Sequence, residues 1–166
     1  MRWIWIDKFI EFESGRRAVA LKNVTLAEEH LHDHFPGYPI MPESLCIEAM
    51  AQTAGILVGE AAKFQEKVIL AKIKKAVFFD CIKPGDTLKL EAVIESFAPE
   101  AAGTAGKVTC GEKLLAEIDL MFSHIDQNLA GKEFPEENFV FNTGTSVFES
   151  LLRDVLSRAG QKAEQT

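Results

Sequence analysis

The alternation of apolar and polar residues near the N-terminus predicts a pair of β-strands. Residues 3–12 alternate or run apolar, Ser14 and Gly15 form a turn signal, and residues 18–24 are again largely apolar. Two such runs joined by a short turn that contains glycine are typical of a β-hairpin. Residues 25–33 are polar and have turn character, so we expect them to form turns.

A proline-rich loop leads into the most apolar segment of the chain. Residues 35–39 read Phe-Pro-Gly-Tyr-Pro, and because each proline fixes its own φ and restrains the residue before it, we expect a rigid, ordered loop. Residues 44–64 are rich in Ala, Leu, Ile and Met and predict a helix, in which Glu48 is the only charge before Glu60. The apolar residues go around the whole helix, and such a helix must be covered on all sides.

Four further strand-like segments follow the predicted helix. They span residues 68–79, 86–97, 106–110 and 113–123, and turns containing Gly or Pro separate them. We expect these strands in meander order. A single buried helix followed by antiparallel strands predicts an α+β domain in which a curved sheet wraps around a long central helix, since few other layers could cover that helix. This is a hotdog-like architecture.

The composition changes after this domain, so we divide the chain into a hotdog-like domain of residues 1–125 and an extension of residues 126–166. In the extension, Ser146 and Glu149 form the S-x-x-E capping box of an amphipathic helix at residues 146–159. One face of that helix is apolar, so we expect it to pack on the same domain or on a neighbouring subunit. The tail beyond it is predicted to be disordered.

The charge of the chain argues against a nucleic-acid partner. The 18 Lys and Arg residues against 25 Asp and Glu residues give a net charge of −7, which repels a phosphate backbone unless the positive charges are strongly segregated. One local cluster, formed by Lys72, Lys74 and Lys75, is positive. This cluster could dock an acidic protein partner, or it could be an ordinary solvated face, and the sequence leaves both interpretations open.

Cysteine content and hydropathy indicate a soluble cytoplasmic protein. The three cysteines, Cys46, Cys81 and Cys110, show no CxxC spacing, and an odd number argues against a closed disulfide framework. Such a chain fits a reducing cytosol. Asp7 and Lys8 interrupt the first apolar run before a signal-peptide core could form, and nothing approaches the ~20 apolar residues that span a bilayer. We therefore expect neither export nor membrane insertion.

Two ionisable residues are candidates for proton transfer. Glu48 lies inside the apolar helix, and because burying a carboxylate is costly unless it is paired or protonated, it is a candidate general acid. It could instead point into a solvent gap or cap a backbone group. His34 precedes the proline-rich loop, and histidine is the side chain best suited to move protons near neutral pH. His30, His32 and His34 together also suggest a metal, but no fourth ligand is evident, so we expect no metal site.

A long run of residues resembles a known family signature. Residues 34–55 read H-F-P-G-Y-P-I-M-P-E-S-L-C-I-E-A-M-A-Q-T-A-G, which resembles the FabZ-type β-hydroxyacyl-acyl carrier protein dehydratases and is similar to the related FabA type. In that family a His opens the HFPG loop and an acid lies 14 positions later, and 48 − 34 gives the same 14 here. Residues 80–86 resemble the later PGD turn of the family. The likeness covers roughly residues 3–124.

The resemblance implies a six-stranded hotdog domain and a homodimer with two active sites, each formed by His34 of one subunit and Glu48 of the other. By this likeness His34 takes the C2 proton of a (3R)-3-hydroxyacyl thioester on acyl carrier protein. Glu48 protonates the leaving hydroxyl, which gives water and the trans-2-enoyl thioester. The family also suggests a hexamer of three dimers, no cofactor, and a place in fatty acid or related lipid biosynthesis.

Further site residues carry over by the same resemblance. Gln52 is one helical turn beyond Glu48 and can reach its carboxylate, although it could equally be polar filler. Gly37 could allow close approach of the backbone to substrate, or simply form the turn. The first turn of the helix would supply amides that stabilise the thioester oxygen. The remaining substrate-binding candidates are Phe35, Met41, Glu43 and Ser44.

The chain departs from the family pattern at one position of the site. Where relatives usually have Met-Pro-Gly, this chain has Met41-Pro42-Glu43, which adds bulk and negative charge beside a developing oxyanion. Dehydration is the first hypothesis, and two alternatives stay open. A hotdog thioesterase would use the helix carboxylate to activate water. A non-catalytic acyl-binding hotdog subunit would keep the dimer after Glu43 had disabled the oxyanion site.

Overall fold

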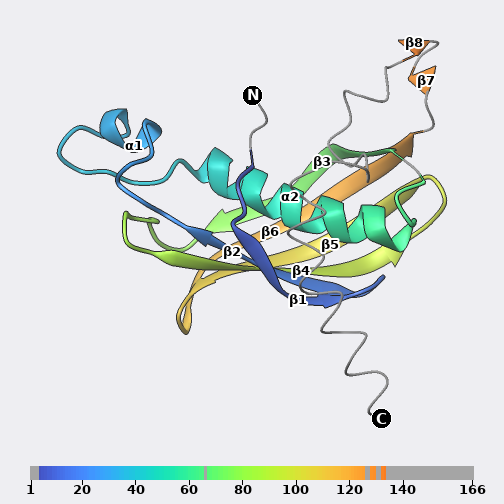
Figure 1. The fold of residues 1–166 in the computed structure, drawn as a ribbon, viewed down its shortest axis with the longest axis horizontal. Helices are drawn as coiled ribbons and strands as arrows, with labels where there is room; N and C mark the ends of the chain where they lie inside the picture. Colours follow the sequence, from blue (N-terminus) through green and yellow to red (C-terminus); the bar gives the residue numbers. More distant parts are fainter. Residues whose placement is uncertain (1–3, 66, 126–127, 130–131, 134–166) are drawn as a thin grey trace.

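The computed structural model describes residues 4–65, 67–125, 128–129 and 132–133 of the 166-residue chain. In this part, a six-stranded antiparallel sheet curves around one long helix (Figure 1). The strands of the sheet are β1 (Lys8–Glu13), β2 (Arg17–Asn23), β3 (Lys67–Phe78), β4 (Thr87–Phe97), β5 (Ala101–Cys110) and β6 (Lys113–Ile125). The long helix is α2 (Glu43–Ala61), which the short helix α1 (His30–Asp33) precedes. Two short strands, β7 (Asn128–Leu129) and β8 (Lys132–Glu133), pair with each other.

The α+β architecture predicted from the sequence is confirmed. The predicted hairpin is present as β1 and β2, which pair antiparallel across a turn where Gly15 has a φ of 67°. Glycine adopts this left-handed conformation without steric cost. The helix predicted for residues 44–64 is α2, and each of the four strands predicted after it corresponds to one of β3 to β6.

The meander order predicted for these four strands is confirmed for β4, β5 and β6 and is wrong for β3. The order across the sheet is β1-β2-β4-β5-β6-β3, so β3 pairs with β6 at the edge and not with β4. The connection from β3 to β4 is bonded elsewhere: Ile82 accepts the N–H of Met41, and the N–H of Gly85 donates to Val24, each at 2.8 Å. These hydrogen bonds place the β3–β4 connection beside the end of β2, and β4 then pairs with β2. Hydrophobic alternation specifies the face that a residue takes but not the neighbouring strand.

Two local features also differ from expectation. β5 begins at Ala101 and not at residue 106, because its first residues are small and carry little strand signal. Residues predicted to form turns include α1, whose Leu31 is buried. The predicted helix at residues 146–159 and the tail after it lie outside the described residues. Of the helices that are described, none is long and apolar enough to cross a bilayer.

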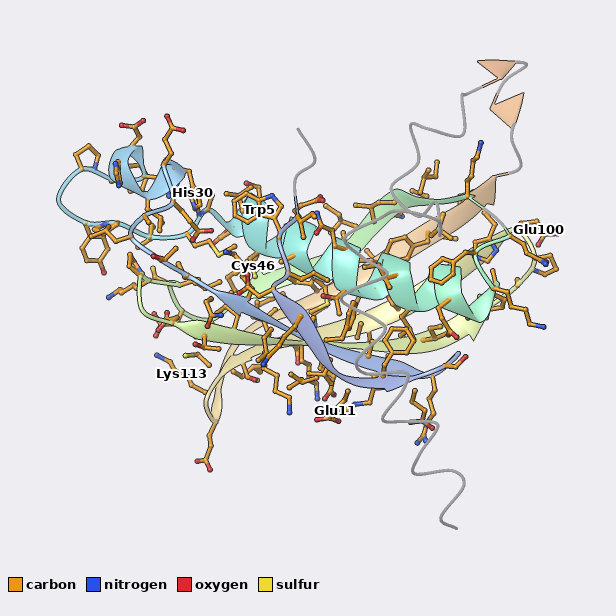
Figure 2. The ribbon with its side chains drawn as sticks, viewed as in Figure 1. Trp5, Glu11, His30, Cys46, Glu100 and Lys113 are labelled. Atoms are coloured by element: carbon orange, nitrogen blue, oxygen red, sulfur yellow. The ribbon has the colours of Figure 1, made fainter. Side chains whose placement is uncertain are left out.

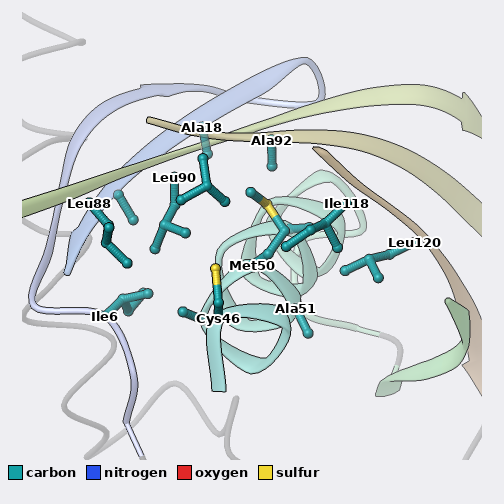
Figure 3. Close-up of a cluster of buried hydrophobic side chains, with 14 of the residues drawn as sticks. Ile6, Ala18, Cys46, Met50, Ala51, Leu88, Leu90, Ala92, Ile118 and Leu120 are labelled. Atoms are coloured by element: carbon teal, nitrogen blue, oxygen red, sulfur yellow. The ribbon is translucent and has the colours of Figure 1, made fainter. Parts of the chain in front are cut away.

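The hydrophobic core lies between α2 and the sheet (Figure 3). Residues 53–59 of α2 are all buried, because a helix segment with apolar residues on all sides must be covered on all sides. The strand residues that cover the helix occupy alternate positions, for example Leu88, Leu90 and Ala92 of β4, because successive side chains of a strand point to opposite faces. Burial of each large aliphatic side chain stabilises the fold by roughly 1.5–3 kcal/mol.

One glycine determines how closely the helix approaches the sheet. A Cβ at Gly106 of β5 would lie 2.6 Å from the carbonyl oxygen of Ile118 and 2.6 Å from Sδ of Met50 on α2. Because the first of these atoms belongs to the backbone, a side chain at this position requires the sheet or the helix to shift. The absence of a side chain at residue 106 therefore allows α2 to lie directly on the sheet.

We expect Gly106→Ala to lower the free energy of unfolding by about 1–3 kcal/mol, because the added methyl group overpacks the helix–sheet contact. For a chain of this length, each kcal/mol lowers Tm by roughly 2–4 °C. Gly103→Ala on the same strand is the matched control, since its Cβ would meet only the Ser96 hydroxyl, at 2.7 Å, which can rotate away. Thermal unfolding followed by circular dichroism measures both variants. Equal losses in the two would contradict the packing argument.

Candidate active site

His34 follows α1 directly and begins a loop closed by main-chain hydrogen bonds. Its N–H donates to the carbonyl oxygen of His30 (3.1 Å), and its own carbonyl oxygen accepts the N–H of Ile40 (2.8 Å). Inside this loop, Phe35 and Tyr38 exchange two main-chain hydrogen bonds of 3.1 and 2.9 Å. The predicted ordered loop is therefore confirmed, and it holds His34 in a half-buried position.

The His34 ring is held in one tautomer. Its Nδ1 lies 2.9 Å from the carbonyl oxygen of Ile40, and because a carbonyl oxygen can only accept a hydrogen bond, the proton of the neutral ring is on Nδ1. The lone pair is then on Nε2. Phe35 stacks on the ring with centroids 4.3 Å apart and an interplanar angle of 27°. Nε2 is therefore a candidate general base whose orientation is fixed.

Glu48 lies in the second turn of α2, half-buried beside the fully buried Ala49. The side-chain amide of Gln52 donates to Oε1 of Glu48 at 2.8 Å, so the contact predicted between these two residues is present. Gln52 Oε1 in turn accepts the main-chain N–H of Trp5 at 2.8 Å. Because Trp5 can only donate here, it fixes the orientation of the amide, and Gln52 presents its NH₂ group to Glu48. This hydrogen bond is made to one of the two oxygens of the Glu48 carboxylate, Oε1.

The first turn of α2 presents N–H groups that no helix carbonyl can accept. The first bond of the helix runs from the N–H of Leu45 to the carbonyl oxygen of Pro42 at 3.0 Å. The N–H groups of Glu43 and Ser44 therefore have no acceptor within the helix. Pro42 contributes no side-chain cap, and Glu43 and Ser44 are both exposed. Amides at the positive end of a helix can stabilise an oxyanion.

A polar strip runs along one face of α2. Its members, Ser44, Glu48 and Gln52, are four residues apart and therefore lie one above the other. Ser44 is exposed, and the other two are half-buried. The strip thus combines helix amides, a carboxylate and the partner of that carboxylate. His34 is not part of this group, because no hydrogen bond or ion pair within the described part of one chain joins it to Glu48.

The other predicted site residues take different places. Met41 is 3% exposed and its N–H bonds to Ile82, so within one chain its side chain belongs to the core. Phe35 is 53% exposed and available for contact with another molecule. Gly37 has a φ of 77°, and a Cβ there would meet nothing within 4 Å. The conformation of the turn, and not a close contact within the chain, therefore requires glycine at residue 37.

The neighbouring histidines do not gather around a metal position. They lie on α1 and not on the extended segment in which alternate residues would share a face. His30 packs against the ring of Trp5, and Nε2 of the exposed His32 lies 2.9 Å from the carbonyl oxygen of Leu26. Across the residues that the structure describes, no group of three or more His, Cys, Asp or Glu residues is arranged to hold a metal ion.

Cys46 is a buried thiol, and Lys75 of the positive cluster is paired. Burial raises the pKa of Cys46 to about 12, and the charge of Glu43 adds to that effect, so the thiol stays protonated at neutral pH and is no nucleophile. Lys75 forms an ion pair of 2.5 Å with Glu117. Because Glu117 alternates with the buried Ile118, this pair lies on the face of the sheet opposite α2, where it neutralises part of the lysine cluster.

Two main-chain groups of the site could not be predicted from the sequence. They are the carbonyl oxygen of Ile40, which orients His34, and the N–H of Trp5, which orients Gln52. Every residue carries a main-chain carbonyl, and every residue except proline carries an N–H, so residue type gives no signal for these roles. The only indication was indirect, since the prolines around Ile40 predicted a rigid loop.

Solved structures with the same architecture identify the fold. The dehydratase heterocomplex ApeI:P from Xenorhabdus doucetiae matches 75% of this chain and 84% of its own with a TM-score of 0.62 and 16% identity. A conserved protein from Pseudomonas aeruginosa matches 71% of this chain and 87% of its own with a TM-score of 0.60 and 16% identity. At such low identity the likeness concerns the fold alone. The fold is a hotdog fold, as predicted.

Sequence comparison then identifies the family. The family model for the FabA-like domain matches residues 3–118. The 3-hydroxyacyl-[acyl-carrier-protein] dehydratase FabZ of Caldanaerobacter subterraneus subsp. tengcongensis is 41% identical over 121 residues, which are 72% of this chain and 86% of that protein. The FabZ of Koribacter versatilis is 43% identical over 114 residues, which are 68% of this chain and 73% of that protein. The chain belongs to the FabA-like family, among the FabZ-type dehydratases.

Proposed function

We propose that this protein converts (3R)-3-hydroxyacyl thioesters on acyl carrier protein to trans-2-enoyl thioesters, in fatty acid or related lipid biosynthesis. The observation that carries the proposal is the family membership, which extends over residues 3–118. The site supports it, because the reaction needs a base, an acid and a group that stabilises negative charge on oxygen. His34, Glu48 and the first amides of α2 are suited to these three roles.

In the proposed reaction, Nε2 of His34 removes the proton from C2 of the substrate. The negative charge that develops on the thioester oxygen is stabilised by the N–H groups of Glu43 and Ser44. The carbonyl oxygen of Ile40, which accepts the Nδ1–H bond at 2.9 Å, stabilises the imidazolium that forms.

The leaving group departs with the help of Glu48. The electron pair of the C2–H bond becomes the C2–C3 double bond, the C3–O bond breaks, and the hydroxyl takes a proton from Glu48 to leave as water. Afterwards His34 holds one proton more and Glu48 one fewer, and exchange with solvent restores both. Gln52 holds Oε1 of Glu48, so the proton is delivered from Oε2.

We further propose that two subunits share each active site. β3 lies at the edge of the sheet and is exposed over residues 70–77, and Leu70 and Ile73 on it are 40% and 45% exposed. A long exposed edge strand presents unpaired main-chain N–H and C=O groups and is a template for pairing with another chain. Antiparallel pairing of β3 with its copy about a twofold axis would satisfy both edges and bring the partner's loop toward the polar strip of α2. Assembly of three such dimers stays a prediction.

The proposed partner and location follow from the same function. The substrate is carried by an acidic carrier protein, which Lys72 and Lys74 are suited to contact, because both are exposed and complementary in charge. We propose a cytoplasmic location, since Cys46, Cys81 and Cys110 are all free thiols, as a reducing compartment maintains them.

Replacement of either proton-transfer residue is expected to abolish product formation. His34→Ala and Glu48→Gln should each lower kcat by roughly 10²–10⁴-fold, because each removes one step of general acid–base catalysis. Enoyl absorbance and free thiol are followed together on a 3-hydroxyacyl-carrier substrate, and unchanged thermal unfolding controls for the fold. Thiol release by the unmodified protein would favour a thioesterase, and no reaction at all would favour the acyl-binding subunit.

Glu43, the residue that departs from the family pattern, is expected to lower kcat. Glu43→Gly is expected to raise kcat by roughly tenfold, because it removes a negative charge within a few ångströms of the developing oxyanion. The same change should lower stability by about 1 kcal/mol, since glycine is a poor helix former and an acid in the first turn favours the helix. Glu43→Gln separates charge from bulk. A kcat that neither variant increases would contradict this role.

The subunit arrangement is tested at the two edges of the sheet. Ile73→Asp on β3 should convert the dimer to a monomer and abolish activity, because it buries a charge in the proposed strand pairing. Ile10→Asp is the matched control, since Ile10 is 39% exposed on β1, the opposite edge strand. Sedimentation velocity and enoyl formation are measured for both. A fully active monomer, or a dimer that Ile73→Asp leaves intact, would refute the arrangement.

A further inference from the structure

Trp5 is in contact with both parts of the candidate site. It precedes β1 and lies between α1 and the first turns of α2 (Figure 2). Its main-chain N–H donates to Gln52 at 2.8 Å, and Gln52 holds Glu48. Its ring contacts the ring of His30, with centroids 5.4 Å apart and an interplanar angle of 67°. The main chain of His30 in turn accepts the N–H of His34.

Another neighbour of the Trp5 ring is a buried cation. Lys22 of β2 is only 7% exposed, and its Nζ lies 5.4 Å from the ring centroid, a distance at which a cation and an aromatic ring attract. Lys22 is itself fixed by an ion pair of 2.5 Å with Glu28 and by a hydrogen bond to the carbonyl oxygen of Asn23. The Trp5 ring is therefore held between a fixed cation and an imidazole.

His30 packs against Trp5 as a neutral ring. Its Nε2 is buried and has no hydrogen-bond partner among the described residues. Burial lowers the pKa of His30, the carboxylate of Glu28 raises it, and the charges of Lys22 and His34 lower it. A protonated ring would place a second cation beside Lys22 and bury an N–H without an acceptor. The neutral form is therefore the one that fits this contact.

We propose that Trp5 and His30 are positioning residues: their ring contact holds the N-terminal segment against α1, so that the Trp5 N–H keeps Gln52 of α2, and through it the Glu48 carboxylate, in one orientation. This inference rests on the proposed function, in which Glu48 donates the proton. Neither ring touches the reacting atoms. Their effect on rate is nevertheless large, because a displacement of about 1 Å in a catalytic group costs on the order of 100-fold.

The contact also gives the site a dependence on pH. The pKa of His30 in the folded chain is lowered from the ordinary value of 6.5, so the neutral ring contributes stability above that pH. This contribution is lost as the pH falls through the folded-state pKa. Protonation of His30 then weakens the contact with Trp5, and Glu48 loses its fixed orientation.

The first test follows the amide of residue 5 and needs no activity. Hydrogen exchange at this amide is measured by NMR in the full-length chain, in Gln52→Leu and in Trp5→Ala. Exchange should be slow in the unmodified protein and faster in Gln52→Leu, which removes the acceptor. It should also be faster in Trp5→Ala, where donor and acceptor both remain and only the ring is missing. Unchanged protection in Trp5→Ala overturns the proposal.

The second test follows the titration of His30. Trp3→Phe leaves Trp5 as the only tryptophan of the chain, and an imidazolium quenches indole emission. Emission should fall between about pH 8 and about pH 5, with a midpoint below that of a free histidine, and His30→Asn should abolish the step. His32→Asn, at an exposed position two residues away, is the matched control and should leave it unchanged. A step that survives His30→Asn overturns the assignment.

The third test measures the effect on the reaction. Trp5→Ala should lower kcat by roughly 10- to 100-fold with little change in KM, and Trp5→Phe, which keeps an aromatic ring, should retain most of the activity. Because Trp5 acts through Gln52, the double variant Trp5→Ala/Gln52→Leu should lose no more than Gln52→Leu alone. If the losses of kcat in the two single variants add up in the double variant, the proposal is overturned. Thermal unfolding curves identify and exclude variants that do not fold. If the unmodified protein forms no enoyl product, the proposed function fails, and the amide and emission measurements still decide this inference.

Discussion

The constraint on which this structure depends is that one helix, apolar around most of its circumference, must be covered on nearly every side. The sheet covers most of α2, and Gly106 lets the helix lie directly on it. Near the N-terminus of α2 the sheet covers less of the helix, and there Ser44 is exposed while Glu48 and Gln52 are half-buried. The amides and carboxylate of the candidate site are therefore found where the core stops, which gives them a partly dry environment without the full cost of burial.

Much of the fold was predictable because hydrophobic periodicity reports burial directly. The uniformly apolar helix required a wrapping sheet, and the alternation of β4 indicated its inner face. Strand order was not predictable, since β3 pairs with β6 through contacts that alternation does not encode. The start of β5 was missed because the small residues 101–105 lack strand signal.

The site was predictable as far as side chains define it. A carboxylate in an apolar helix and a histidine before a proline-rich loop indicated Glu48 and His34, and the contact of Gln52 with Glu48 is present as expected. The shared site between subunits stays a prediction, as do the substrate contacts of Phe35 and Met41. The sequence could not indicate the groups that orient the site, because Trp5 and Ile40 act through their main chains.

The bond between the His34 ring and residue 40 separates two properties that usually change together in an enzyme. The acceptor is the main-chain oxygen of Ile40. Replacement of the Ile40 side chain therefore alters the shape and hydrophobicity of the loop without changing which nitrogen of the His34 ring carries the proton. The shape of the loop can therefore diverge at this position while the placement of the proton on the His34 ring is inherited intact.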